Sequence, residues 1–341
     1  MKRSTIDGQH KASELVRRWV KYFGPALLIL SLISSLANIT TRAQSVARNQ
    51  PIATPEEWKA VEQAIGKSGT LLSGGVFKIG LPRNDLEVTV RGIYVNPVLA
   101  LGSWVAFKKT GNMTMVMGDL VLTEAEVGRV MWSLQQDGIE QTALHNHVLD
   151  ESPRIMYMHI IGHGEALKLA EAIRHALSLT KTPLESSPGA TLKRREAVEQ
   201  LEVPKIEKAL GRSAKENSGV YQFSIPRAEK VMEGEMEVPP SMGVATAINF
   251  QPTGAGRAAI TGDFVLTATE VNLVLRALRE NGIAVTAIHS HMLSESPPLL
   301  HALLGERRCI ETRPRSAIGP GQNKFNSTQP VVSLLSLCRF V

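Results

Sequence analysis

The stretch GDLVLTEAEV at residues 118–127 decides the architecture, because it returns as GDFVLTATEV at residues 262–271. The same offset of 144 residues relates GVF at 75–77 to GVY at 219–221. Chance does not hold one register over many such matches, and self-similarity at a fixed offset indicates a duplicated unit. The sequence therefore predicts two tandem repeats.

The first repeat is the better example of how each unit begins. Thr54 is a suitable N-cap for a helix over residues 55–67. Residues 76–121 are rich in strand-forming residues, with glycine and proline turn signals between the runs. We therefore expect a helix followed by a β-rich stretch.

The end of the unit starts from the same motif. Thr123 and Glu126 have the spacing of a capping box, which opens a helix that Gly138 ends. Its apolar face uses Val127, Val130, Met131 and Leu134. Strands over 141–149 and 154–161 and a helix over 165–179 follow. This order of elements predicts the α+β class.

Residues 1–43 have the order of a secretory signal peptide. A basic stretch precedes an apolar run over 26–39, and small residues precede residue 44. The apolar run is short for crossing a bilayer. We expect cleavage after Ala43 and export to the periplasm or outside the cell, with an uncleaved membrane anchor as the alternative.

The basic charge of the chain lies near its two ends. Residues 1–43 and 302–341 carry net charges of +5 and +4, so residues 44–301 carry −3 of the total +6. Because the body is mildly acidic, the basic total charge gives no support for binding to phosphates. We therefore expect no nucleic-acid partner, and membrane contact only through the N-terminal segment.

The second repeat departs from the first after Pro297. We divide the chain into repeat 1 at 44–182, a linker at 183–196, an incomplete repeat 2 at 197–301 and an aberrant tail at 302–341. The tail shows none of the closing strand and helix of repeat 1. If the tail is translated back into codons and the reading frame is moved by one base, the codons can encode Met-His and further residues that match repeat 1 at the 144-residue offset. At the matching place, repeat 1 has Met158-His159. We interpret this as a frameshift at or just before Pro298, with an unrelated natural tail as the alternative.

Two histidines in each repeat are the candidate site. His145 and His147 are expected on one strand, where alternate side chains share a face, and Glu151 follows four residues later. Repeat 2 has the same set as His289, His291 and Glu295. Two imidazoles and a carboxylate suit Zn, Mn, Fe or Ni and leave positions open for water or substrate.

Other polar residues near the histidines receive different interpretations. His159, on the next strand, is a candidate fourth ligand or a donor to a ligand. Asp119 and Asp263 follow a glycine on a strand, and we interpret them as turn residues more than as ligands, while Glu126 and Glu270 are explained by helix capping. The only cysteines, Cys309 and Cys338, lie in the tail, which excludes cysteine ligands within the repeats.

These motifs resemble the LppY/LpqO family, a domain of unknown function (1259) of bacterial envelope proteins. The resemblance rests on GDLVLTEAEV, on GIEQTALHNHVLDESPR at residues 138–154 and on the Met-His pair, and it implies an exported bacterial protein. Our leading hypothesis is a divalent-metal-binding protein or metal-dependent enzyme. The alternatives are a non-catalytic module that binds a small-molecule or cell-envelope ligand, and a truncated product without function.

Overall fold

The computed structural model describes residues 54–184, 201–254 and 256–305. The predicted signal peptide, most of the linker and most of the tail lie outside the described residues.

Each repeat builds one six-stranded antiparallel sheet. In repeat 1 the spatial order is β1 (Thr70–Leu72), β2 (Val76–Pro82), β5 (Gly102–Thr110), β6 (Met113–Thr123), β9 (Ile155–Gly164) and β7 (Glu140–His145). In repeat 2 it is β10 (Lys215–Asn217), β11 (Val220–Pro226), β14 (Ala245–Gly254), β15 (Arg257–Thr267), β18 (Leu299–Gly305) and β16 (Val285–Ser290). The two orders correspond strand for strand, which confirms the predicted duplication.

A small three-stranded sheet accompanies each large one. The first has the order β4 (Ile93–Tyr94), β3 (Thr89–Val90) and β8 (Glu151–Ser152). The second has the order β13 (Met236–Val238), β12 (Val231–Glu233) and β17 (Glu295–Ser296). In both repeats the small sheet therefore includes the segment just after the histidine pair.

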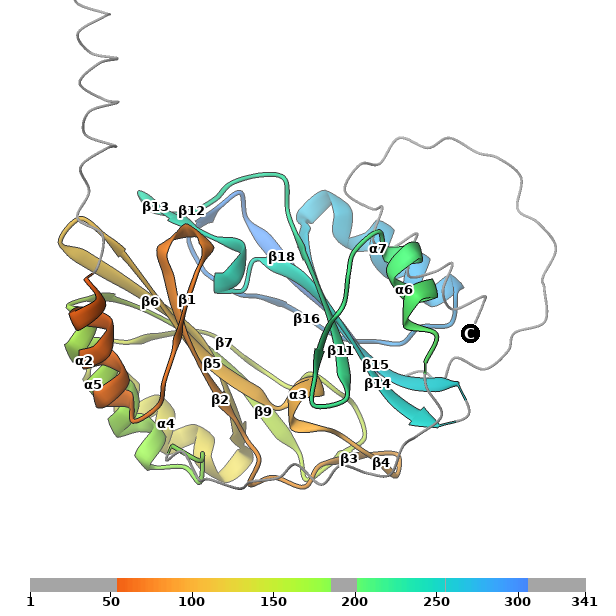
Figure 1. The fold of residues 1–341 in the computed structure, drawn as a ribbon, viewed down its shortest axis with the longest axis horizontal. Helices are drawn as coiled ribbons and strands as arrows, with labels where there is room; N and C mark the ends of the chain where they lie inside the picture. The colour runs from red at the N-terminus through yellow and green to blue at the C-terminus, as the bar shows by residue number, and fades with distance from the viewer. Residues whose placement is uncertain (1–53, 185–200, 255, 306–341) are drawn as a thin grey trace, which may run out of the picture. The chain divides into compact units, whose positions relative to one another are not determined.

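Helices cover one face of each large sheet (Figure 1). In repeat 1 these are α2 (Pro55–Ile65), α4 (Glu124–Gln136) and α5 (Ala166–Ser178), and a short helix α3 (Pro97–Ala100) precedes β5. In repeat 2 they are α6 (Val203–Leu210) and α7 (Ala268–Glu280). The side chain of Thr54 accepts a hydrogen bond from the backbone of Glu57, and both expected capping boxes, at Thr123 and Thr267, are present. These elements confirm the predicted α+β class.

Hydrophobic packing explains the helix positions and joins the two repeats. Val130 and Leu134 of α4 are fully buried in a cluster that also holds α2, α5 and the first sheet. A second cluster combines Met115 and Met117 of repeat 1 with Met242 of repeat 2. Burial of such side chains supplies the main favourable contribution to folding, so the two repeats share part of their core.

A buried arginine ties β2 to the start of α4. Arg83 donates to the backbone oxygen of Val121 at 2.7 Å and to the carboxylate of Glu126 at 2.8 Å. Arg227 makes the same two bonds in repeat 2, to Val265 and to Glu270. Glu126 and Glu270 are therefore structural ion-pair partners as well as capping residues.

Two details differ from the expected elements. The strand expected over 141–149 ends at His145, so His147 lies in the following loop. We expected repeat 2 to lack its closing strand, but β18 forms between β15 and β16 and extends beyond our boundary at residue 301. The apolar residues Leu299, Leu300, Ala302 and Leu303 are sufficient for a buried central strand.

Within the described ranges, no helix combines the length and apolar character needed to cross a bilayer.

Candidate metal centre

The two histidine clusters lie in contact with each other between the repeats. His145 ends β7, and His289, its equivalent at the 144-residue offset, lies near the end of β16. Their rings are stacked with centroids 3.6 Å apart. A contact between two equivalent residues is expected where two like units face each other across a two-fold axis.

Reciprocal hydrogen bonds support the same relation. The hydroxyl of Thr142 donates to the backbone oxygen of His291 at 2.6 Å, and the hydroxyl of Thr286 donates to that of His147 at 2.5 Å. Thr142 and Thr286 are equivalent at the 144-residue offset, and so are His147 and His291. Each repeat therefore holds the histidine loop of the other in place.

His159 of β9 lies at the centre of the cluster. Its Nε2 is 3.2 Å from Nε2 of His145 and 3.7 Å from a carboxylate oxygen of Asp119. Two groups of potential ligand atoms lie within 4.8 Å of one another: His145, His159 and His289, and Asp119, His147 and His159. A His/Asp group of this kind could hold a metal ion, and both groups include His159.

Five histidines of the cluster have pKa values below the ordinary value of an imidazole, so these five rings are neutral near pH 7. Burial lowers the pKa of His145 to about 4 and that of His289 to about 3. Burial, followed by neighbouring imidazoles, lowers the pKa values of His147, His159 and His291 well below 6.5. Neutral imidazoles keep the lone pairs that a metal requires.

Many of these polar atoms have no hydrogen-bond partner among the described residues. They are Nε2 of His147, Nδ1 of His159, both ring nitrogens of His289, Nδ1 of His291, Nε2 of His301 and one carboxylate oxygen of Asp119. Each buried polar atom without a partner costs roughly 1–3 kcal/mol. Such a concentration is unusual in a folded protein, and a bound cation would satisfy several of these atoms at once.

The aspartates are the main correction to the sequence analysis. Our interpretation of Asp119 and Asp263 as turn residues was wrong, because they lie within β6 and β15 and face the histidines. Burial, and to a lesser degree Asp263, raises the pKa of Asp119 to about 8, so a nearby cation would favour its ionised form. Asp263 accepts a hydrogen bond from Nδ1 of His301 at 2.9 Å. Although burial opposes it, His301 holds the pKa of Asp263 low.

The predicted carboxylate ligands have another role in the structure. Glu151 accepts a hydrogen bond from the backbone N–H of Ile155 at 2.9 Å, and Glu295 accepts one from Leu299 at 2.8 Å. Neither glutamate belongs to the two groups of convergent ligand atoms among the described residues. The structure thus brings together His145, His147, His159, His289 and His291, while the glutamates brace the loops that follow them.

His301 is a site residue that the sequence analysis missed. In the strand register it stands opposite His289, as Tyr157 stands opposite His145. Its ring is 4.7 Å from that of His291 and 5.4 Å from that of His289. The 144-residue offset relates His301 to Tyr157, so comparison of the two repeats did not indicate a histidine ligand at this position.

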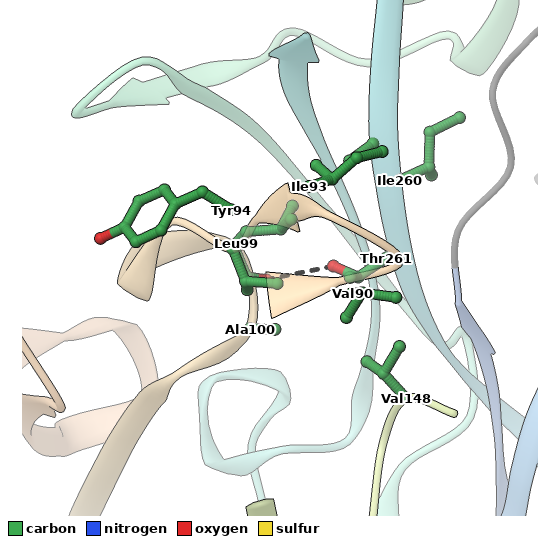
Figure 2. Close-up of a pocket in the computed structure, with 10 residues that line it drawn as sticks. Val90, Ile93, Tyr94, Leu99, Ala100, Val148, Ile260 and Thr261 are labelled. Atoms are coloured by element: carbon green, nitrogen blue, oxygen red, sulfur yellow. Dashed lines mark hydrogen bonds between the residues drawn. The ribbon is translucent and has the colours of Figure 1, made fainter. Parts of the chain in front are cut away.

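A small pocket between the repeats has no histidine in its lining (Figure 2). It is lined mainly by apolar residues of both repeats, including Val90, Leu99, Val148 and Ile260, and Thr261 donates to the backbone oxygen of Leu99 at its edge. Its volume of about 20 Å³ is room for a single water-sized sphere. A small-molecule site needs roughly 300 Å³ or more, so this pocket gives no support to a bound organic ligand.

Low-pH destabilisation of the metal-free protein is a direct expectation from these pKa values. Between pH 6.5 and about 4 the unfolded chain binds more protons than the folded histidines, so the free energy of unfolding is highest above pH 6.5 and falls as the pH drops toward 4. Asp119 and Glu151, with pKa values raised to about 8 and about 7, oppose this trend, but the five lowered histidines outnumber them. Urea denaturation across this range should show the loss, and a His145→Ala/His289→Ala variant should show a shallower one. A flat profile in the wild type contradicts the buried neutral histidines.

Fold and site together define a duplicated α+β protein with a buried histidine cluster where its repeats meet. The chain belongs to the family described as Domain of Unknown Function (DUF1259), which matches residues 59–179 and 204–304. The two matched segments coincide with the two repeats.

Comparisons with individual proteins add little. No curated protein matches the chain. Among solved structures, the trimeric bacterial microcompartment shell protein PduB aligns with 12% sequence identity over 71% of this chain and 84% of its own, with a TM-score of 0.16. That likeness is too weak to support an argument about fold or function.

Proposed function

We propose that the protein binds one divalent transition-metal ion at the histidine cluster between its repeats, with His159 as the central ligand. The observation that carries this proposal is the convergence of buried, neutral imidazoles, several of whose ring nitrogens have no partner among the described residues. An alternative explanation, hydrogen bonding across the sheet, accounts for the contact between His145 and His159 and for that between His301 and Asp263, and it leaves the other ring nitrogens named above without a partner.

The chemistry of the ligands narrows the kind of ion. Imidazole nitrogens suit Zn, Fe and Ni, and a carboxylate such as Asp119 extends the range to Mn. Cysteine is absent from the described residues, as the sequence requires. Three protein ligands leave coordination positions for water or substrate, which is the arrangement of catalytic more than of structural sites.

We further propose that the protein works outside the cytoplasm, in the periplasm or extracellular space. This rests on the basic, apolar and small-residue order of residues 1–43. Metal binding there would depend on ions available in that compartment.

Elemental analysis of the full chain, purified without a polyhistidine tag, tests the metal proposal. We expect about one ion per chain in the wild type and background levels in a His145→Ala/His147→Ala variant, because that pair removes a ligand from each group. His163→Ala is a matched control, since His163 is an exposed residue of the same strand as His159. Metal-free wild type after loading with Zn, Mn, Fe and Ni, or equal metal in wild type and double variant, refutes the proposal.

A further inference from the structure

The group formed by Asp119, His147 and His159 lies entirely within repeat 1, so the duplication implies an equivalent group in repeat 2. At the 144-residue offset the first two residues return as Asp263 and His291, and the third position is Leu303. Two of the three ligands are therefore retained in repeat 2.

The strand register places Leu303 where a third ligand belongs. In repeat 1, His159 stands opposite Asp119 on β6 and opposite Ala143 on β7. In repeat 2, Leu303 stands opposite Asp263 on β15 and opposite Ala287 on β16. The backbone neighbours are equivalent on both sides, so the imidazole is replaced by an isobutyl group in the same frame.

The retained residues show the consequence of that replacement. Leu303 is 4% exposed, and Nδ1 of His291 has no partner among the described residues. The carboxylate of Asp263 is instead engaged by His301, which occupies the position of Tyr157. The group in repeat 2 thus lacks the third ligand, at position 303, and its carboxylate, that of Asp263, is already hydrogen-bonded to His301.

We infer that repeat 2 contains a second divalent-metal site of the same kind. This site lacks only the ligand at position 303, and His301 competes with the metal for the carboxylate of Asp263. This rests on the proposed function of the first site. Substitution of Leu303→His together with His301→Tyr reproduces the residues of repeat 1 and completes the site.

Metal stoichiometry of the full chain tests this inference. Wild type, Leu303→His/His301→Tyr, and the same pair with His291→Ala are loaded with Zn²⁺, dialysed and measured by elemental analysis, and circular dichroism monitors folding. We expect one more ion per chain in the double variant than in the wild type, and loss of that additional ion with His291→Ala. The single variant Leu303→His, which leaves the Asp263–His301 contact in place, should bind the second ion more weakly.

The outcomes separate this inference from the proposed function. A wild type without metal refutes the first site, whereas equal metal in wild type and double variant refutes the second. A double variant that unfolds without metal and folds when Zn²⁺ is added supports the second site, because binding to the native state stabilises it. A double variant and a Leu303→His variant that both stay unfolded with Zn²⁺ present count against it.

Discussion

Replacing His159 by alanine is expected to weaken metal binding by at least about 100-fold, more than any other single substitution in the cluster. His159 belongs to both groups of convergent ligand atoms, whereas His145 and His147 each belong to one. Loss of His145 leaves the group of Asp119, His147 and His159, and loss of His147 leaves His145, His159 and His289. Even residues that only support a metal ligand alter affinity by roughly 10–100-fold, so loss of the shared ligand should exceed that range.

Competition with a chromophoric chelator measures these affinities on the full chain. His145→Ala and His147→Ala, each made alone, should retain measurable binding, and the exposed His163→Ala should match the wild type. The order of the effects carries the test. If His159→Ala binds as tightly as either single variant, the ion does not use the ligand that the two groups share, and the proposed position of the metal is wrong.

The sequence predicted the internal organisation of each repeat because local signals specify it. The Thr123 and Glu126 pair fixes the start of α4, and the apolar spacing of Val130 and Leu134 fixes its buried face. The shared side of His145 and His147 was also predicted, and their rings lie 4.9 Å apart. These features depend on contacts within a few residues along the chain.

The joining of two clusters into one was not predictable, because an offset shows that two repeats are alike and not how they pack. The bond from Thr142 to His291 spans 149 residues, and nothing near either residue indicates it. The role of Asp119 was missed for a related reason. Aspartate after glycine is a common turn signal, and only the neighbouring strand β9 shows that this aspartate faces His159.

The glutamates show that the same spacing also fits a structural role. Glu151 has the separation from His147 that a metal motif would have, but a bend follows His147 and the carboxylate bonds to the backbone of Ile155. Glu295 makes the equivalent bond in repeat 2. Retention of the same acid in both repeats therefore reflects a shared structural role as readily as a shared ligand.

Arg83→Ala is expected to lower the free energy of unfolding by about 3–5 kcal/mol, the usual cost of removing one partner of a buried ion pair. The side chains of Arg83 and Glu126 are 1% and 5% exposed, and their contact of 2.8 Å is reinforced by the bond from Arg83 to Val121. Although burial would raise it, Arg83 keeps the pKa of Glu126 below its ordinary value. Without the arginine, a buried carboxylate at the start of α4 loses its counter-charge.

Repeat 2 supplies the matched control for this prediction. Arg227 makes the same contacts with Glu270 and Val265, but the side chains of the pair are 8% and 12% exposed. Water can therefore solvate Glu270 in part, and Arg227→Ala should cost less than Arg83→Ala. A second comparison is Arg83→Ala/Glu126→Gln, which removes the uncompensated charge and should recover part of the lost stability. Urea denaturation of the metal-free proteins measures all three, and an equal loss for Arg83→Ala and Arg227→Ala would show that burial of the ion pair does not determine its contribution.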